Sequence, residues 1–198
     1  MHILPQFDAF AAAHAVGQAQ LVSTKLVSDL ETPVSVMLKL ARNSAYGFLL
    51  ESVEGGATRG RYSMIGLKPD LIWRVEGRKA EINRKALLDP EGPFEPHGLE
   101  PNGIEPHGLE PHGDDPLGAL RMLIAESRIE ADEDLPPMAA GLFGYIGYDM
   151  VRLMERLPAV NPDPLGLPDA ILVRPTIMAI FDSVKDEVTL VTPVYPSP

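Results

Sequence analysis

The sequence predicts an α+β fold in which largely antiparallel, sandwich-like β-sheets carry about four helices. Helix-like segments occur at intervals rather than after every strand, which argues against a doubly wound parallel sheet. The last long apolar segments predict a closing hairpin. The segments with strand character are residues 47–53, 61–67, 70–76, 79–83, 170–182 and 187–192.

The first part of the chain predicts a helix, a strand and a second helix. Residues 7–19 are rich in alanine and predict a short helix, and residues 21–27 predict a strand. Thr32 and Pro33 predict the next helix start, because threonine caps free N–H groups and proline has no N–H to leave unpaired. The expected apolar face of this helix, at helical spacing, consists of Val34, Met37, Leu38 and Ala41.

The later elements follow from similar signals. Asp115 before Pro116 predicts the start of a third helix, and residues 139–149 predict a strand that leads into a helix at 150–157. Glycines at 141, 144 and 147 do not follow the G-x-G-x-x-G order of a dinucleotide-binding loop. We therefore expect them to let the strand pack closely against a helix. Trp73, in the middle of a strand, is expected in the core.

Residues 95–114 form a proline-containing pentapeptide repeat, Glu-Pro-His-Gly-Leu in its first unit. One residue in five is proline, which excludes a helix or a central strand and favours successive β-turns. We place a low-complexity insert at 92–114 and expect an extended surface loop. The segment 89–115 contains no Lys or Arg and accounts for eight of the eleven net negative charges.

Composition narrows the class of protein. There is no cysteine, so neither a disulfide framework nor a thiolate metal site is expected. No apolar run approaches the length of a membrane span, and the first residues lack a signal-peptide pattern. No basic stretch offers a footprint for nucleic acid. We expect a cytoplasmic protein with no nucleic-acid or membrane partner.

The histidines predict no designed metal site. Three of the five, His97, His107 and His112, lie in the repeat. Their spacing in a turn-rich segment differs from the fixed spacing of a helical metal site, so we expect a solvated loop. Weak adventitious Ni²⁺ or Zn²⁺ binding is the alternative. No G-x-S-x-G motif occurs, and we expect no catalytic and no metal-binding residues in this chain.

The candidate binding residues lie in two neighbouring strand segments. Residues 49–52 read Leu-Leu-Glu-Ser, and residues 60–66 read Gly-Arg-Tyr-Ser-Met-Ile-Gly. They place an apolar wall beside a carboxylate, hydroxyls and a guanidinium, which suits a small amphipathic ligand such as an amino acid. The alternative, which composition alone favours, is that Glu51 and Arg61 form an ion pair across the strands.

These segments resemble the N-terminal domain of anthranilate synthase component I. The resemblance runs in order from about residue 21 to 194 and includes residues 115–121, 143–149 and 167–170. It implies that residues 1–198 form a regulatory domain with half of a tryptophan feedback-inhibition site. The residues that the resemblance assigns to this half-site are Leu50, Glu51, Ser52, Arg61, Tyr62 and Ser63.

The resemblance also implies that catalysis takes place elsewhere. The family converts chorismate and glutamine or ammonia into anthranilate and pyruvate, a lyase step of tryptophan biosynthesis. Its chorismate-binding C-terminal domain, with Mg²⁺ carboxylates, has no counterpart in this sequence. We expect this chain alone to be inactive, to carry no cofactor and to bind L-tryptophan weakly. A glutamine amidotransferase subunit, component II, would join through the full-length protein.

Two other interpretations stay open. The chain could be the N-terminal domain of aminodeoxychorismate synthase component I or a related chorismate enzyme, in which a bound tryptophan would be structural. It could also be a stand-alone binding or interaction module. Glu51 in the Leu-Leu-Glu-Ser sequence at residues 49–52 favours anthranilate synthase over the aminodeoxychorismate branch.

Overall fold

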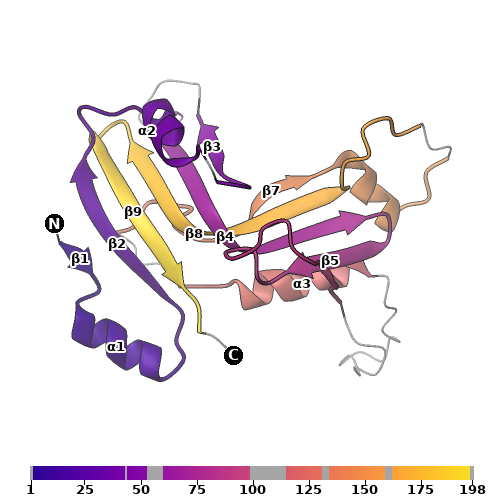
Figure 1. The fold of residues 1–198 in the computed structure, drawn as a ribbon, viewed down its shortest axis with the longest axis horizontal. Helices are drawn as coiled ribbons and strands as arrows, with labels where there is room; N and C mark the ends of the chain where they lie inside the picture. The colour runs from indigo at the N-terminus through magenta and orange to yellow at the C-terminus, as the bar shows by residue number, and fades with distance from the viewer. Residues whose placement is uncertain are drawn as a thin grey trace. The chain divides into compact units, whose positions relative to one another are not determined.

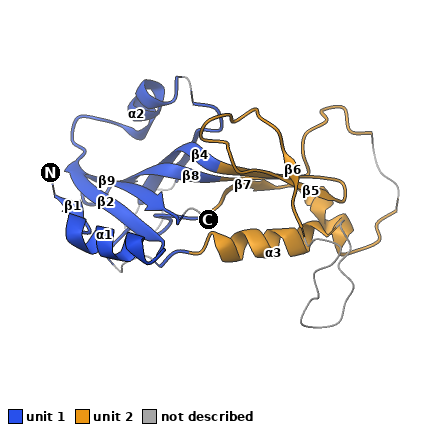
Figure 2. Cartoon of the chain, turned by 60° about the horizontal axis from the view of Figure 1, so that its bottom comes forward, with its two compact units in different colours: residues 1–70, 129–141, 174–198 blue, residues 71–128, 142–173 orange. Residues whose placement is uncertain are grey.

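The computed structural model describes residues 2–42, 44–52, 60–98, 115–130, 134–158 and 162–196. The chain divides into two compact units (Figure 2). Unit 1 comprises residues 1–70, 129–141 and 174–198, and unit 2 comprises residues 71–128 and 142–173. Two long strands, β4 (Tyr62–Glu76) and β8 (Ala170–Asp182), contribute residues to both units.

Unit 1 contains the N-terminal elements and the last strand of the chain. Its strand order is β1-β2-β9-β8-β4, with β3 paired to β4 (Figure 1). The pairs β1–β2, β2–β9, β3–β4 and β8–β9 are all antiparallel. Besides its parts of β4 and β8, the elements are β1 (Ile3–Leu4), α1 (Phe7–Ala15), β2 (Gln20–Val27), α2 (Pro33–Leu40), β3 (Phe48–Glu51) and β9 (Glu187–Val194).

Unit 2 combines the remaining parts of the long strands with short elements. β5 pairs with β4, β6 with β5 and β7 with β8, each pair antiparallel. A tight turn at Gly77 joins β4 to β5, because Glu76 and Lys79 face each other across it. The elements are β5 (Lys79–Asn83), β6 (Glu95–Pro96), α3 (Pro116–Glu126), β7 (Phe143–Ile146) and the 3₁₀ helix η1 (Tyr148–Leu153).

The predicted α+β class is confirmed. Three α-helices and one 3₁₀ helix accompany antiparallel strands in the described part of the chain. The strand pattern predicted more than one sandwich-like sheet, whereas the described strands belong to one hydrogen-bonded sheet. The expected strands 61–67 and 70–76 are in fact one continuous strand, β4, which passes through Lys68 at a φ of 51°.

Helix α2 begins as predicted, but only part of its predicted apolar face contacts the core. The Oγ1 of Thr32 accepts from the N–H of Ser35, and the Oγ of Ser35 accepts from the N–H of Thr32, which forms a capping box. Val34 and Leu38, which the spacing placed on the buried face, are exposed. Met37 and Ala41 of the predicted face do contact the sheet, because the side of the helix that packs overlaps the predicted face only in part. The helix-side contacts are Val36, Met37 and Ala41, against Ile65, Leu67, Ala179 and Phe181.

The core of unit 2 forms around Trp73. This side chain is completely buried, so its predicted core position is confirmed. It packs with Val75 and Ile82 from the sheet and with Leu123 from α3. Helix α3 therefore packs on the part of the sheet that lies in the same unit.

The glycines around residue 144 allow a close approach, as predicted, but the neighbour is a strand. A Cβ on Gly144 would lie 2.0 Å from the backbone oxygen of Ile171 in β8, and the φ of Gly144 is 152°. Strand β7 covers only residues 143–146, and the expected helix at 150–157 is the 3₁₀ helix η1. The spacing of the glycines indicated tight packing without showing the type of partner.

The pentapeptide repeat is described only at its beginning. Glu95 and Pro96 form β6, opposite Ile82 and Glu81, and the N–H of His97 donates to the carbonyl of Ala80. The expectation of a pure loop is therefore wrong at residues 95–96. β6 is the last strand in the sheet order, where a proline costs no inner ladder hydrogen bond. Residues 99–114, with the other two repeat histidines, lie outside the described residues.

We predict that Gly144→Ala strongly destabilises unit 2. The new Cβ would collide with the Ile171 backbone, which cannot move away as a flexible side chain can. The loss in the free energy of unfolding should exceed about 2 kcal/mol, measured by urea denaturation. Gly98→Ala is the control, since a Cβ there meets nothing within 4 Å, and its effect should stay within about 0.5 kcal/mol. Equal effects of the two substitutions would contradict the prediction.

Candidate functional site

The two segments singled out in the sequence meet in space. Strand β3 pairs with the start of β4 so that Glu51 faces Ser63 and Leu50 faces Met64. Ser52 directly follows the end of β3, and Arg61 directly precedes the start of β4. Residues 53–59, between the two segments, lie outside the described residues. Antiparallel pairing thus brings the predicted residues to one end of a strand pair in unit 1.

The alternation of side chains divides these residues between the two faces of the sheet. Leu49 and Ile65 pack in the cluster that contacts α2, and Glu51 and Ser63 share their face because side chains alternate along a strand. Leu50 points to the opposite face. A ligand that touches both Leu50 and Glu51 must therefore lie at the end of the strand pair, where both faces can be reached.

The predicted residues form an open wall. Leu50 is 48% exposed, Glu51 and Ser52 are exposed, and Arg61, Tyr62 and Ser63 are partly buried. The wall offers a carboxylate, two serine hydroxyls, a tyrosine ring with its hydroxyl and apolar surface. These groups suit an amphipathic ligand, but burial of such a ligand needs a second surface.

Arg61 has a carboxylate partner, and that partner is Asp182 at the end of β8. Its Nε and Nη2 donate to the two Asp182 carboxylate oxygens, at 2.9 and 2.5 Å. The Arg61 guanidinium also lies 4.9 Å from the centre of the Tyr62 ring. The alternative in which Arg61 pairs with Glu51 is wrong, because the chain folds a more distant carboxylate onto it. The sequence offered no signal for this partner.

The hydrogen bonds within this pair keep both groups charged. The hydrogen bonds from Arg61 lower the pKa of the Asp182 carboxyl, and this effect exceeds the rise that burial causes. Hydrogen bonds from the N–H groups of Val184 and Lys185 lower the same pKa further. In turn, the hydrogen bonds to Asp182 raise the pKa of Arg61. The result is a charged, bidentate bridge beside the candidate wall.

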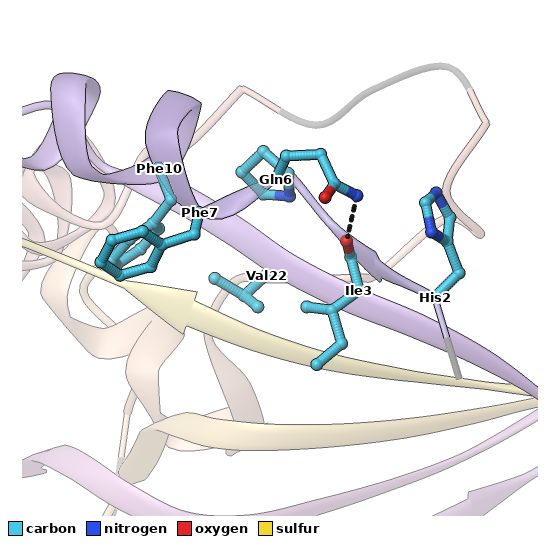
Figure 3. Close-up of a pocket in the computed structure, with 7 residues that line it drawn as sticks. His2, Ile3, Gln6, Phe7, Phe10 and Val22 are labelled. Atoms are coloured by element: carbon cyan, nitrogen blue, oxygen red, sulfur yellow. Dashed lines mark hydrogen bonds between the residues drawn. The ribbon is translucent and has the colours of Figure 1, made fainter.

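A separate pocket lies near the N-terminus, away from the predicted residues. It has a volume of about 530 Å³. Figure 3 shows Phe7 and Phe10 of α1 on one side of it and Ile3 with His2 on the other, with Gln6 donating to the Ile3 carbonyl. The residues that line it are His2, Ile3, Pro5, Gln6, Phe7, Phe10 and Val22. None of them was a predicted site residue.

The described residues offer neither a cluster of metal-ligating side chains nor a membrane-spanning helix. No three His, Asp or Glu side chains gather there as a metal ion would require. None of the described helices has the length and apolar character needed to cross a bilayer.

Comparisons with known proteins agree on one family. The chain is 53% identical over 196 residues to anthranilate synthase component 1 of Cereibacter sphaeroides, covering 98% of this chain and 36% of that protein. It is 38% identical over 171 residues to the Thermus thermophilus protein of the same name, covering 84% of this chain and 30% of that protein. The Mycolicibacterium smegmatis protein of that name is 38% identical over 185 residues, covering 93% of this chain and 31% of that protein. This chain spans about a third of the length of these relatives.

The other comparisons add little. No protein-family model matches the chain. The crystal structure of anthranilate synthase component I from Streptococcus pneumoniae gives a TM-score of 0.43 at 20% identity, covering 82% of this chain and 30% of that one. The sequence similarity extends along nearly the whole of this chain. This chain therefore belongs to the anthranilate synthase component 1 family and corresponds to the N-terminal part of those proteins.

Proposed function

We propose that residues 1–198 act as the N-terminal, non-catalytic domain of an anthranilate synthase component I and hold half of a tryptophan feedback site. The observation that carries the proposal is the 53% identity to a protein of that name over 98% of this chain. All three relatives described above share the name, which favours anthranilate over the aminodeoxychorismate branch.

In this proposal the chemistry belongs to a domain that corresponds to the other two thirds of the relatives. That domain would bind chorismate and Mg²⁺ and release anthranilate and pyruvate. Ammonia would come from glutamine through an amidotransferase subunit, component II. We assign no catalytic group and no cofactor to this chain, and we keep a cytoplasmic location as a prediction.

The wall at the end of β3 and β4 has the chemistry that one side of a tryptophan site needs. The Glu51 carboxylate suits the ammonium group, and the hydroxyls of Ser52 and Ser63 suit the polar end of the amino acid. Leu50 and Tyr62 supply apolar surface for the indole. The exposure of this wall leaves room for a second wall, which we assign to the catalytic domain.

Inhibition follows if tryptophan binds the low-activity arrangement of the two walls more tightly than the active one. The ligand then shifts the population by its difference in affinity for the two states. An isolated wall offers about half of the contacts, so this chain alone should bind tryptophan weakly.

We predict that this chain makes anthranilate only when joined to a catalytic domain. The test joins residues 1–198 to the remaining two thirds of the Cereibacter sphaeroides relative and follows anthranilate fluorescence with chorismate and ammonium. The joined protein should be active and inhibited by L-tryptophan, and residues 1–198 alone should be inactive. A joined protein that makes anthranilate but is not inhibited by L-tryptophan would contradict the proposed regulatory role.

We predict that Ser52→Leu in the joined enzyme removes tryptophan inhibition and spares catalysis. The substitution deletes a hydroxyl and adds bulk at an exposed position, so the fold should tolerate it. The tryptophan concentration for half inhibition should rise at least about tenfold, with kcat and the chorismate KM unchanged. Asp29→Leu, at another exposed position of unit 1, is the control. Unchanged inhibition in Ser52→Leu would exclude this half-site.

A further inference from the structure

Asp182 and its neighbour Ser183 hold Arg61 by both its side chain and its backbone. The Asp182 carboxylate accepts two hydrogen bonds from the guanidinium. The N–H and the Oγ of Ser183 both donate to the Arg61 carbonyl, each at 3.0 Å. Residue 61 is therefore fixed at two points to the turn between β8 and β9.

The same carboxylate also orders the turn from which it comes. Its Oδ1 accepts from the N–H of Val184 at 3.1 Å and from the N–H of Lys185 at 3.4 Å. Only 8% of the Asp182 side chain is exposed. Removal of either partner would leave a largely buried charge without its counterion, so the pair resists opening.

This anchor lies directly beside the candidate wall. Arg61 immediately precedes β4, and Ser63, two residues on, faces Glu51 across the strand pair. The guanidinium that Asp182 holds also lies over the Tyr62 ring. A shift of Arg61 would move the hydroxyl of Ser63 and the ring of Tyr62 together, and binding sites lose affinity when their groups are misplaced by about 0.5 Å.

We propose that Asp182 is a positioning residue for this half-site, acting through Arg61. It holds the end of β4 in the arrangement that a bound amino acid requires, and it does not touch the ligand itself. This inference rests on the function proposed above. It gives Arg61 the role of a brace whose guanidinium is committed to Asp182, in place of a direct contact to the ligand carboxylate.

A second aspartate–arginine pair in the same unit provides a matched control. Arg174 donates through Nε and Nη2 to the two carboxylate oxygens of Asp70, at 2.9 and 2.8 Å. This pair joins β8 to Asp70 of β4, and Asp70 lies nine residues after Arg61. Asp70→Asn and Asp182→Asn each weaken a bidentate arginine–aspartate bridge, and only the second bridge lies next to the half-site.

The first test measures positioning without any ligand. Amide hydrogen exchange of residues 1–198 is followed by NMR in the wild type, Asp182→Asn and Asp70→Asn. Amide protons of residues 49–51 and 62–65 should exchange at least about tenfold faster in Asp182→Asn, and Asp70→Asn should leave them unchanged relative to the rest of unit 1. Equal acceleration in both variants, or in neither, would overturn the inference.

The second test measures the consequence in the joined enzyme. Asp182→Asn should raise the tryptophan concentration for half inhibition at least about fivefold with kcat and the chorismate KM unchanged, whereas Asp70→Asn should not. If Asp182→Asn does not fold, Arg61→Lys keeps the charge, loses the bidentate geometry and should give a smaller rise. Local exchange that changes without any change in inhibition would overturn the inference. Absence of tryptophan inhibition in the wild-type joined enzyme would instead overturn the proposed function. The amide hydrogen exchange of the first test would then decide by itself whether Asp182 positions this wall.

Discussion

The backbone pairing of β4 is the constraint on which both the fold and the candidate site depend. The strand has 15 residues and pairs with β3 near its start and with β5 near its end. It supplies Ile65 and Leu67 to the core of unit 1, and Trp73 and Val75 to the core of unit 2. A slip of one residue in its register would turn each of these side chains to the opposite face, so burial in both units fixes the register that places Ser63 opposite Glu51.

Local signals made part of this architecture predictable. The capping box at Thr32, the turn at Gly77 and the buried Trp73 each depend on a few adjacent residues and on general preferences of backbone and side chain. The meeting of the two candidate segments was also predictable, because two strands joined by a glycine-rich connection usually pair with each other. In these cases the sequence neighbourhood contains the interacting groups.

The remaining features depend on partners that are distant in sequence. Arg61 is bound to a carboxylate 121 residues away, while Glu51, the nearer candidate, lies on the neighbouring strand. The packed face of α2 was predicted only in part, because Met37 and Ala41 contact the sheet as expected, whereas Val34 and Leu38 are exposed and Val36 packs instead. Which of two apolar stripes is buried depends on the sheet below the helix, and no local pattern contains that information.

The geometry of the wall restricts how such a half-site can regulate an enzyme. The Glu51 carboxylate and the exposed Leu50 side chain point to opposite faces of the strand pair. A ligand can therefore contact both of them only at the end of the strands. A ligand there is covered by protein on one side and needs a second surface on the other. Because coupling between two sites is reciprocal, any ligand that binds more tightly when the second surface closes must also favour closure. This coupling is stronger when the first wall is rigid. If the wall rearranged on binding, part of the binding free energy would be lost to that rearrangement. A charged bridge to a neighbouring hairpin, as between Arg61 and Asp182, supplies that rigidity.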